Sequence, residues 1–422
     1  MSTPPSSVGQ MTGARGLGRP FWTLWSANAL TNTADGIVRI LIPLLAVQLT
    51  THPGLVATAT VLVSLPWAIA SLPVGVLADR RDRKTMLATA NAGRVVILLA
   101  LTTAAVTGWL SLPVLYVATF ALGVCEVVAD LTSGTLVPMV ADGAKLPRAN
   151  SWLEGTQIVL DEFVGPPLGG LLVALGAASA TSSTAGAYLL AVGTLVLLRG
   201  AYRPVREQST AVRADLVEGL RFIWHHRLRR TVTLMVAVMA ACWSGWMAVL
   251  VVYALGAMQL SQVSYGLLLA TLAVGGLLGS IVAAPIERRF GRQTVLGLDV
   301  AAGVVMLTTP ALTSNVYLVG AATMLGGLGS AMWNVSVASL NQLITPESIR
   351  GRASAVSRMA GWGSMPLGAA LAGVLASTLG VQAVFAGAAM LTAVLIIPVI
   401  RVTTPTEIDE AITEARHQDA AS

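Results

Sequence analysis

Charged side chains are rare in the long apolar runs of this 422-residue chain, and eight of them are informative. A charge inside a membrane is energetically expensive and usually belongs to a transport pathway or a proton relay. An acid without a basic partner in a low-dielectric site takes up a proton more readily than it does in water. The eight candidates for such chemistry are Asp35, Arg39, Arg94, Glu126, Asp130, Asp161, Glu162 and Asp299.

The spacing of these charges suggests how they act. Asp35 and Arg39 are spaced i, i+4 and share one helix face, so they form either a local ion pair or part of a functional site. Glu126 and Asp130 have the same spacing but like charges, which disfavours their simultaneous ionisation. Among these eight candidates, the first half of the chain has five acids but only two arginines, and we expect Arg94 to neutralise an acid of the fourth or fifth run. Three acids then remain unbalanced. The candidates for proton coupling are Glu126 and Asp130 first, then Asp35, Asp161 and Glu162. Asp299 lies near the start of its run and can reach the membrane interface.

The composition places these residues in an all-α membrane protein. Hydrophobic residues make up 55% of the chain and charged residues 11%, whereas soluble domains have about 25% charged residues. Only helices and closed barrels satisfy their backbone in lipid, and long apolar runs indicate helices. A segment of about 20 apolar residues spans a bilayer. Twelve such segments are predicted, at residues 21–49, 54–78, 85–106, 112–140, 150–175, 183–198, 231–257, 265–286, 294–312, 316–340, 354–376 and 381–400.

The longest polar connection divides the twelve segments into two groups of six. The predicted order is an N-terminal tail (1–20), a six-helix half (21–198), a linker (199–230), a second six-helix half (231–400) and a C-terminal tail (401–422). In the linker, apolar residues recur at helical spacing among charges and predict a short amphipathic helix on the membrane surface. These residues are Val212, Leu216, Leu220 and Ile223.

Lysine and arginine cluster in alternate connections and predict the topology. The connections between these clusters, such as 107–111 and 257–264, contain no lysine or arginine. The positive-inside rule then puts both termini in the cytoplasm. The basic balance of the chain therefore reflects its orientation in the lipid bilayer, and it does not indicate a nucleic-acid partner.

Signatures of enzymes and cofactors are not found in the sequence. Cys125 and Cys242 lie inside apolar runs and indicate neither a disulfide nor a metal site. There is no phosphate-binding loop, so ATP is not expected to supply the energy. We also find no triad or metal-ligand pattern, and we expect no enzyme activity, no cofactor and no metal.

The connection between the second and third segments is dense in charge. Residues 75–84 read Gly-Val-Leu-Ala-Asp-Arg-Arg-Asp-Arg-Lys and include Gly75, Asp79, Arg80, Arg83 and Lys84. This pattern resembles the loop signature of the major facilitator superfamily, except that Asp82 stands where that family usually has glycine. A degraded echo follows the eighth segment at residues 287–292. The resemblance implies two repeated six-helix halves.

The resemblance also implies a role for this loop as a latch. In the superfamily, the acid of the loop sits at the N-terminal end of helix 11, where the helix dipole favours an anion. Asp79 would then lie near Arg352 and Ala353, while Arg80 and Arg83 would face acids of the first half.

The fifth segment contains a proline that is expected to bend it. Gly165, Pro166, Gly169 and Gly170 form a Gly-Pro-x-x-Gly-Gly pattern. This pattern resembles the signature of drug/proton antiporters of the superfamily, and residues 146–150 and 345–352 resemble the macrolide-efflux and enterobactin-exporter branch. The two glycines one turn apart, Gly165 and Gly169, should allow close contact with another helix.

Candidate substrate contacts follow from the same resemblance. In the superfamily, helices 1 and 10 line a central cavity. On these helices, and on helix 3, the candidates are Asn32, Asp35, Arg39, Arg94, Trp333 and Asn334.

The function implied is proton-coupled export of a small amphiphilic compound by a monomeric antiporter. Two other hypotheses stay open at this point. One is another transported substrate, namely a siderophore, a lysolipid or a nutrient taken up. The other is a receptor or scaffold on the same fold, although buried acids bring no advantage to a scaffold.

Overall fold

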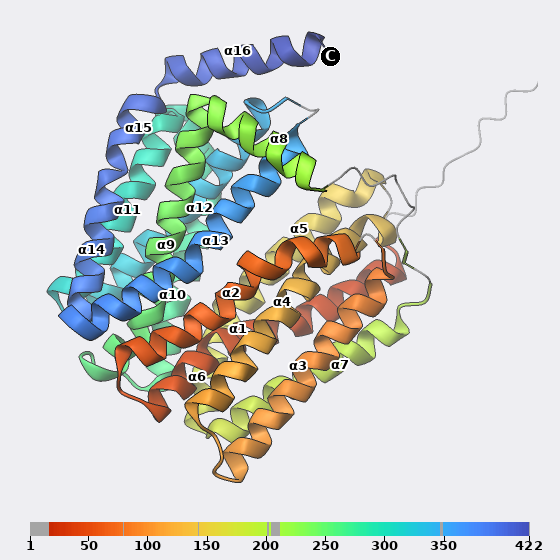
Figure 1. The fold of residues 1–422 in the computed structure, drawn as a ribbon, viewed down its shortest axis with the longest axis vertical. Coiled ribbons are helices and arrows are strands. Elements are labelled where there is room, and N and C mark those ends of the chain that lie inside the picture. Colours follow the sequence, from red (N-terminus) through yellow and green to blue (C-terminus); the bar gives the residue numbers. More distant parts are fainter. Residues whose placement is uncertain are drawn as a thin grey trace, which may run out of the picture.

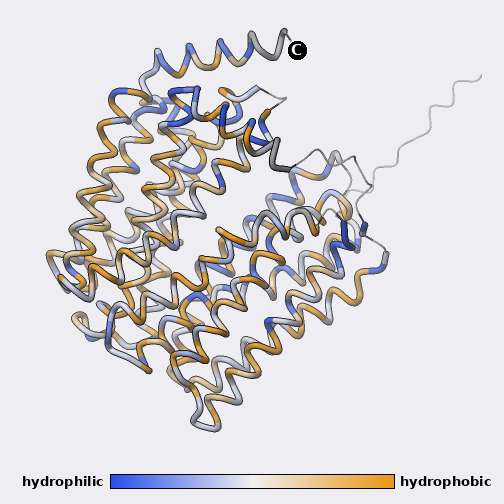
Figure 2. The backbone as a smooth tube through the Cα atoms, viewed as in Figure 1, coloured by the Kyte–Doolittle hydropathy of each residue, from blue (hydrophilic) through white to orange (hydrophobic). Residues whose placement is uncertain are grey.

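Long helices joined by short connections make up the computed structural model, which describes residues 17–78, 80–141, 143–200, 202–203, 212–346 and 349–421. Twelve helical segments of this part of the chain are long and apolar enough to cross a membrane. Figure 1 shows them as two groups that diverge toward one side, and Figure 2 shows apolar residues along most of their length. The predicted all-α fold class with twelve spanning helices is confirmed.

The first half contains six of these segments. They are α1 (Arg19–Leu49), α2 (Pro53–Ala78), α3 (Arg83–Val106), α4 (Leu112–Val140), a composite fifth span and α7 (Ala177–Leu197). The fifth span follows the short turn η1 (Gly143–Lys145) and consists of α5 (Leu146–Gln157), the π-helix η2 (Ile158–Val164) and α6 (Gly165–Ala174).

The second half begins after a connecting helix, α8 (Val212–His225). Its spans are α9 (Arg227–Gly256), α10 (Gln262–Phe290), α11 (Arg292–Leu312), α12 (Val316–Leu343), α13 (Arg350–Leu379) and the pair α14 (Val381–Val394) and α15 (Ile396–Val402). A further helix, α16 (Pro405–Ala421), follows.

Two helices lie outside the twelve spans, one in the predicted linker and one in the predicted C-terminal tail. The helix expected in the linker is α8, with Ile223 buried. The second, α16, occupies most of the stretch predicted only as a tail, and it lies across the end of the second half (Figure 1). Its residues Ile408 and Ala411 are buried in the core of that half, and Glu407 pairs with Arg227 of α9 at 2.8 Å. The helix therefore gains its stability from tertiary packing, which a local pattern does not reveal.

Among the described residues, the hydrophobic core joins the two halves at one end. We call the end at which α1 and α13 begin the terminal end. At the opposite end, one cluster combines buried residues of both halves, among them Leu45, Val249 and Phe385. At the terminal end, separate clusters contain residues of a single half, such as Leu24 with Leu198 in the first. The second half has its own cluster around Leu340. The halves are thus tied together at the opposite end.

Close backbone contacts reinforce this tie. A Cβ on Gly170 of α6 would overlap the carbonyl oxygen of Gln262 at the start of α10. A Cβ on Gly54 of α2 would lie 3.2 Å from the carbonyl oxygen of Gly373 in α13. Small residues allow this approach of backbones, as is typical of helix contacts in membranes.

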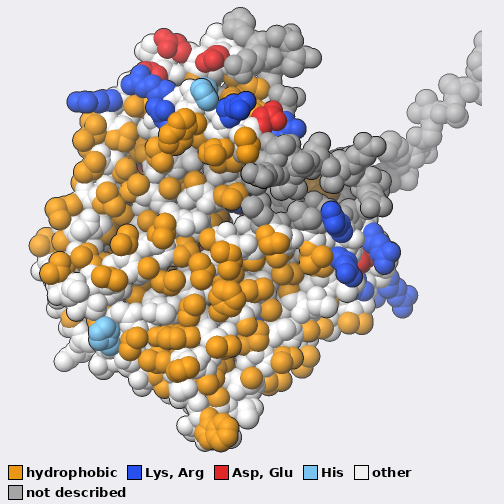
Figure 3. Space-filling view, viewed as in Figure 1, with side chains coloured by type: hydrophobic (Ala, Val, Ile, Leu, Met, Phe, Trp, Pro, Cys, Tyr) orange, Lys and Arg blue, Asp and Glu red, His pale blue; other side chains and the backbone are white. Residues whose placement is uncertain are grey.

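Charged side chains lie mainly at the ends of the helices. In the space-filling view, lysines and arginines gather at the terminal ends of the two halves, while the visible face between them is mostly apolar and uncharged (Figure 3). This distribution is that expected of helices embedded in lipid.

Candidate functional site

Helix α1 brings the charged residues of the first half together. Gly36 faces the fifth span so closely that a Cβ there would overlap the carbonyl oxygen of Asp161. A Cβ on Gly165 would in turn overlap Gly36. Because these backbones touch, the charged neighbours Asp35 and Arg39 lie within reach of helices on either side of α1.

Arg39 forms a salt bridge with the fifth span. Its Nη2 lies 2.6 Å from Oδ2 of Asp161. The arginine side chain is 41% exposed and the aspartate side chain 7% exposed. The second oxygen of Asp161, Oδ1, is buried and has no hydrogen-bond partner.

Asp161 lies in the π-helix that precedes Pro166. The amide of Gly165 donates to the carbonyl of Leu160, five residues earlier, in place of the usual four. A proline ring clashes with the carbonyl four residues before it, and a wider turn relieves that clash. The sequence predicted a bend at the proline. The structure shows a π-helical segment that includes Asp161 and Glu162, and such segments are frequent at functional sites.

Asp35 belongs to a second, separate network. Arg94 of α3 places Nη1 3.2 Å from Oδ1 of Asp35, and the hydroxyl of Tyr188 on α7 donates to the same oxygen at 2.6 Å. The guanidinium carbon of Arg94 lies 4.9 Å from the centre of the Tyr188 ring. Arg94 also donates to Asn91 at 3.2 Å, and Asn91 donates to Thr31 at 3.1 Å. The Arg94 side chain is only 2% exposed, so it depends on these partners.

One of the two alternatives for Asp35 and Arg39 is therefore excluded, and the expectation about Arg94 is wrong. Asp35 and Arg39 do not pair with each other, although they share one helix face. Arg94 does not neutralise an acid of the fourth or fifth span but pairs with Asp35 of the first. The reason is the packing of α3 and α7 on α1, which stacks Arg94 on Tyr188 beside Asp35. Arg39 is the residue that pairs with an acid of the fifth span, Asp161.

Three of the candidate acids form no salt bridge or hydrogen bond within the described chain: Glu126, Asp130 and Glu162. Glu126 is half-buried and feels the charges of both networks, through Asp35, Arg94, Arg39 and Asp161. Asp130 is exposed one turn further along α4. On the same side of α4, Ser133 donates to Asn28 of α1 at 2.9 Å.

The other candidate substrate contacts are spread over both halves. Asn32 is half-buried on α1, and Asn334 is exposed on α12. Trp333 is 5% exposed and packs in the core of the second half with Val300 and Val337.

The loop between α2 and α3 is anchored within the first half. Asp79 lies outside the described residues, and Arg80 is exposed. Arg83 donates to the carbonyl of Thr135 on α4 at 2.9 Å, so it faces a backbone oxygen where an acid was expected. Lys84 donates to the carbonyl of Leu198 at 2.5 Å.

Asp82, which replaces the usual glycine of the motif, has a structural role. Its carboxylate caps α3 by accepting the amide of Thr85 at 2.9 Å, and it accepts the amide of Tyr202 at 2.7 Å. Burial opposes ionisation of Asp82, but the two amides, the Thr85 hydroxyl and the charge of Arg203 together outweigh it and hold the pKa of the carboxyl below its ordinary value. The residue thus ties the start of α3 to the end of α7.

The echo of this loop in the second half is anchored in a comparable way. Glu287 pairs with Arg292 at 2.6 Å and accepts a hydrogen bond from Ser336 of α12. Arg292 donates to Ser339 of α12 at 3.3 Å. In both halves, the loop is held by a helix of its own half.

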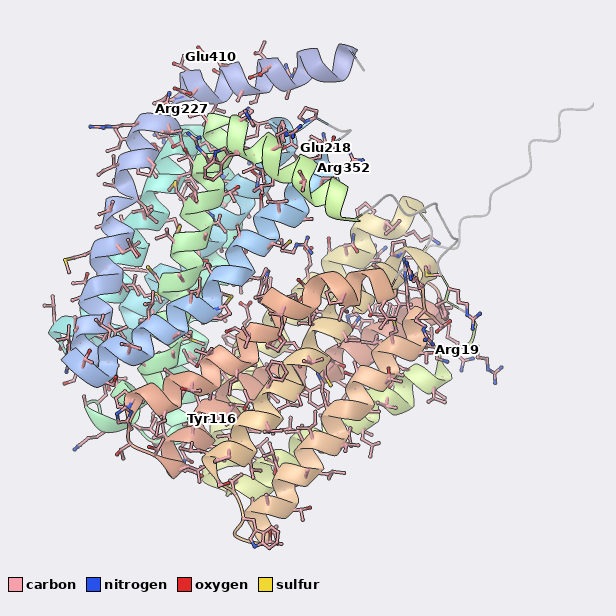
Figure 4. The ribbon with its side chains drawn as sticks, in the orientation of Figure 1. Arg19, Tyr116, Glu218, Arg227, Arg352 and Glu410 are labelled. Atoms are coloured by element: carbon pink, nitrogen blue, oxygen red, sulfur yellow. The ribbon has the colours of Figure 1, made fainter. Side chains whose placement is uncertain are left out.

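The connecting helix α8 is attached to the second half. Glu218 and Arg352 of α13 lie 3.0 Å apart and point toward one another (Figure 4). A Cβ on Gly219 would lie 2.7 Å from the carbonyl oxygen of Arg352.

The second half has one deeply buried acid among the described spans, Asp299 of α11. It is 2% exposed, and its Oδ2 has no hydrogen-bond partner. Its backbone packs against Gly329 of α12. Its side chain is enclosed by protein and does not extend to the molecular surface, contrary to expectation.

Sequence reasoning missed the polar side chains that hold Arg94. Asn91 was detectable, because it lies three residues before Arg94 on the same helix face. Tyr188 gave no such signal, since a single tyrosine in an apolar helix does not reveal its partner.

Twelve spanning helices in two halves, with a charged network inside one of them, define a membrane transporter of the major facilitator type. The chain belongs to the transmembrane secretion effector family of this superfamily, whose family model matches residues 18–421. Relatives and folds of this kind are transporters and not enzymes.

Similar proteins agree with this classification. The chain is 30% identical over 388 residues to the multidrug efflux pump Tap of Mycolicibacterium fortuitum. The aligned region covers 87% of this chain and 91% of that protein. It is 27% identical over 390 residues to Tap of Mycobacterium tuberculosis, and this alignment covers 88% of this chain and 90% of that protein.

Solved structures share the fold at low sequence identity. The nucleoside transporter NupG aligns with a TM-score of 0.72 and 12% identity, covering 91% of this chain and 99% of that one. A bacterial homologue of the iron transporter ferroportin aligns with a TM-score of 0.64 and 17% identity, covering 91% and 99%.

Proposed function

We propose that this protein exports a small amphiphilic compound, such as a drug or antibiotic, in exchange for protons. The named relatives are multidrug efflux pumps, and the family is one of secretion. We further propose that it acts as a monomer in a bacterial cell membrane, with both termini in the cytoplasm.

The observation that carries proton coupling is the excess of acid in the first half. Asp161 and Asp35 each have an arginine partner, at 2.6 Å and 3.2 Å. Glu126, Asp130 and Glu162 have none within the described chain. A low-dielectric site favours the neutral form of such acids, and they exchange protons when their surroundings change. Glu126 is the leading candidate, because its neighbours include both paired networks.

Substrate contact is proposed for the polar residues beside these acids. Arg39 is paired, yet 41% exposed, so a substrate can reach it. Asp35 is 25% exposed and offers its carboxylate to a cationic substrate, in competition with Arg94. Asn32 on α1 and Asn334 on α12 would contact the substrate from the two halves, with Trp333 supporting α12.

The mechanism proposed is alternating access by rocking of the two halves. Its support is the arrangement of the core, which combines both halves at one end and divides into separate clusters at the terminal end. Two rigid halves joined at one end can pivot there with little loss of packing within either half.

The test is proton release in proteoliposomes that contain a pH-sensitive dye and a panel of labelled drugs. We expect substrate-driven proton movement from the unaltered protein. Glu126→Gln or Asp130→Asn, made singly, should abolish it in at least one case while binding survives. The matched control is Glu154→Gln, since Glu154 is an exposed acid of α5.

Two outcomes would contradict the proposal. Full proton-coupled transport by both α4 variants would exclude these acids and direct attention to Asp161 and Glu162. Substrate binding by the unaltered protein without any flux would instead favour a receptor.

A further inference from the structure

The two halves meet along a seam formed by α2 and α13. From the opposite end inward, Gly54 lies against Gly373, and Ala57 shares a buried cluster with Ala369. The last aromatic contact of the seam is between Trp67 and Trp362, whose ring centres are 4.3 Å apart with an angle of 20° between the planes.

Arg358 continues the face of α13 that forms this seam. It precedes Trp362 by four residues, which places it on the same face, one turn closer to the terminal end. Ser357 and Gly361 instead face α9, through contacts with Thr233 and Val236. Arg358 is exposed, and it forms no salt bridge or hydrogen bond within the described chain.

Asp130 occupies the corresponding level in the first half. On α4, Val127 and Leu131 pack in one cluster with Trp67 of α2. Around the axis of α4, Asp130 lies between the face that packs on α2 and the face of Ser133, which bonds to α1. It is therefore directed fully toward neither α1 nor α2. It is exposed and about one turn beyond the level of the tryptophan stack.

These positions put two opposite, unpaired charges on the two sides of the interface, just past the tryptophan stack. Among the charges that act on Asp130, Arg358 is the one from the second half. Asp35 of α1 and Arg94 of α3 are those from the first half.

We infer that Asp130 and Arg358 form a salt bridge across the two halves when their terminal ends approach each other, with the Trp67–Trp362 stack as the fixed contact beside it. Arg358 is thus a positioning residue of the transport cycle, acting through Asp130. The inference rests on the alternating access proposed above. The salt bridge would give Asp130, an acid of the first half, a partner from the second half.

The experiment measures the distance between the terminal ends rather than transport. Spin labels are attached at Ser151→Cys on α5 and Ser354→Cys on α13, both exposed positions, after Cys125 and Cys242 are replaced by Ala. Pulsed electron resonance on the protein in nanodiscs gives the ratio of short to long distances. Asp130→Arg and Arg358→Asp are measured singly and together.

We expect each single charge reversal to lower the short-to-long ratio by about threefold, the range of a modest ion pair. The double reversal should restore the ratio, because the pair then forms with the charges exchanged. Arg358→Lys should keep most of it, and Arg358→Gln is a milder variant if a reversal prevents folding. The matched control is Arg401→Asp on α15, an exposed arginine of the second half remote from the seam.

The outcomes separate this inference from the proposed function. Two distance populations that neither single reversal nor Arg358→Gln changes would overturn the salt bridge and leave alternating access intact. Failure of the double reversal to restore the ratio would also overturn it. A single population in the unaltered protein would overturn alternating access and the salt bridge together.

Discussion

At the scale of single residues, the two arginines of the first half differ in how much they depend on their acids. Arg94 is 2% exposed and Arg39 41% exposed. A buried charge that loses its partner cannot recover solvation, whereas an exposed one can. The Asp35–Arg94 pair should therefore matter for stability, and the Asp161–Arg39 pair more for function.

This difference predicts unequal effects of two similar substitutions. Asp35→Asn should lower the free energy of unfolding by about 3 kcal/mol, because Arg94 stays buried without a carboxylate. Asp161→Asn should cost much less. Thermal unfolding of the detergent-solubilised variants checks the order, and Arg94→Gln added to Asp35→Asn should recover part of the loss. Equal melting temperatures for the two single variants would contradict this account.

At the scale of elements, the fifth span contacts both halves of the molecule. Gly165 and Gly169 press against α1 of the same half, at Gly36 and Ile37. The next residue, Gly170, presses against α10 of the other half. The π-helical segment with Asp161 lies directly before these contacts, so a shift of α6 against α10 would be felt at the acid.

A bulky side chain at the contact with α10 should therefore impair transport. Overpacking of a close contact costs about 1–3 kcal/mol. We expect Gly170→Leu to insert into membranes at a normal level but to lose most drug efflux. Gly193→Leu on α7 is the control, because no atom lies within 4 Å of a Cβ at that position. Efflux assays at matched expression measure both, and full efflux by Gly170→Leu would leave this contact without a role.

At the scale of the whole molecule, the charges inside the membrane are unequally divided. The first half has two salt bridges and three acids without such partners, whereas Asp299 is the deeply buried acid of the described second half. Asp299 packs on Gly329 and has no basic partner within the described chain. We infer that proton coupling resides in the first half and does not involve Asp299.

If Asp299 takes no part in coupling, its replacement by the amide should have little effect on transport. Asp299→Asn should keep substrate-driven proton release in proteoliposomes, while Glu126→Gln, compared in the same vesicles, should lose it. The reverse result, with release lost in Asp299→Asn and kept in Glu126→Gln, would move coupling to the second half.

Features that depend on composition and local spacing were predictable from the sequence. Twelve spanning helices follow from runs of apolar residues, because lipid requires every backbone group to be satisfied within a helix. The charged members of the network were also identifiable, because a charge in an apolar run is conspicuous. The fifth span was recognised as irregular because proline removes a hydrogen bond wherever it occurs.

The partners of those residues were decided only by the tertiary structure. Spacing indicated that Asp35 and Arg39 share a face, but the approach of Gly36 to Gly165 brought Arg39 to Asp161. The stacking of Arg94 on Tyr188 then gave Asp35 a different arginine. The helix α16, the hydrogen bond from Tyr202 to Asp82 and the alignment of Asp130 with Arg358 likewise depend on residues far apart in the chain. Two side chains form a contact only where their helices pack together. That packing depends on the shapes of many small residues along both helices, which local sequence patterns do not reveal.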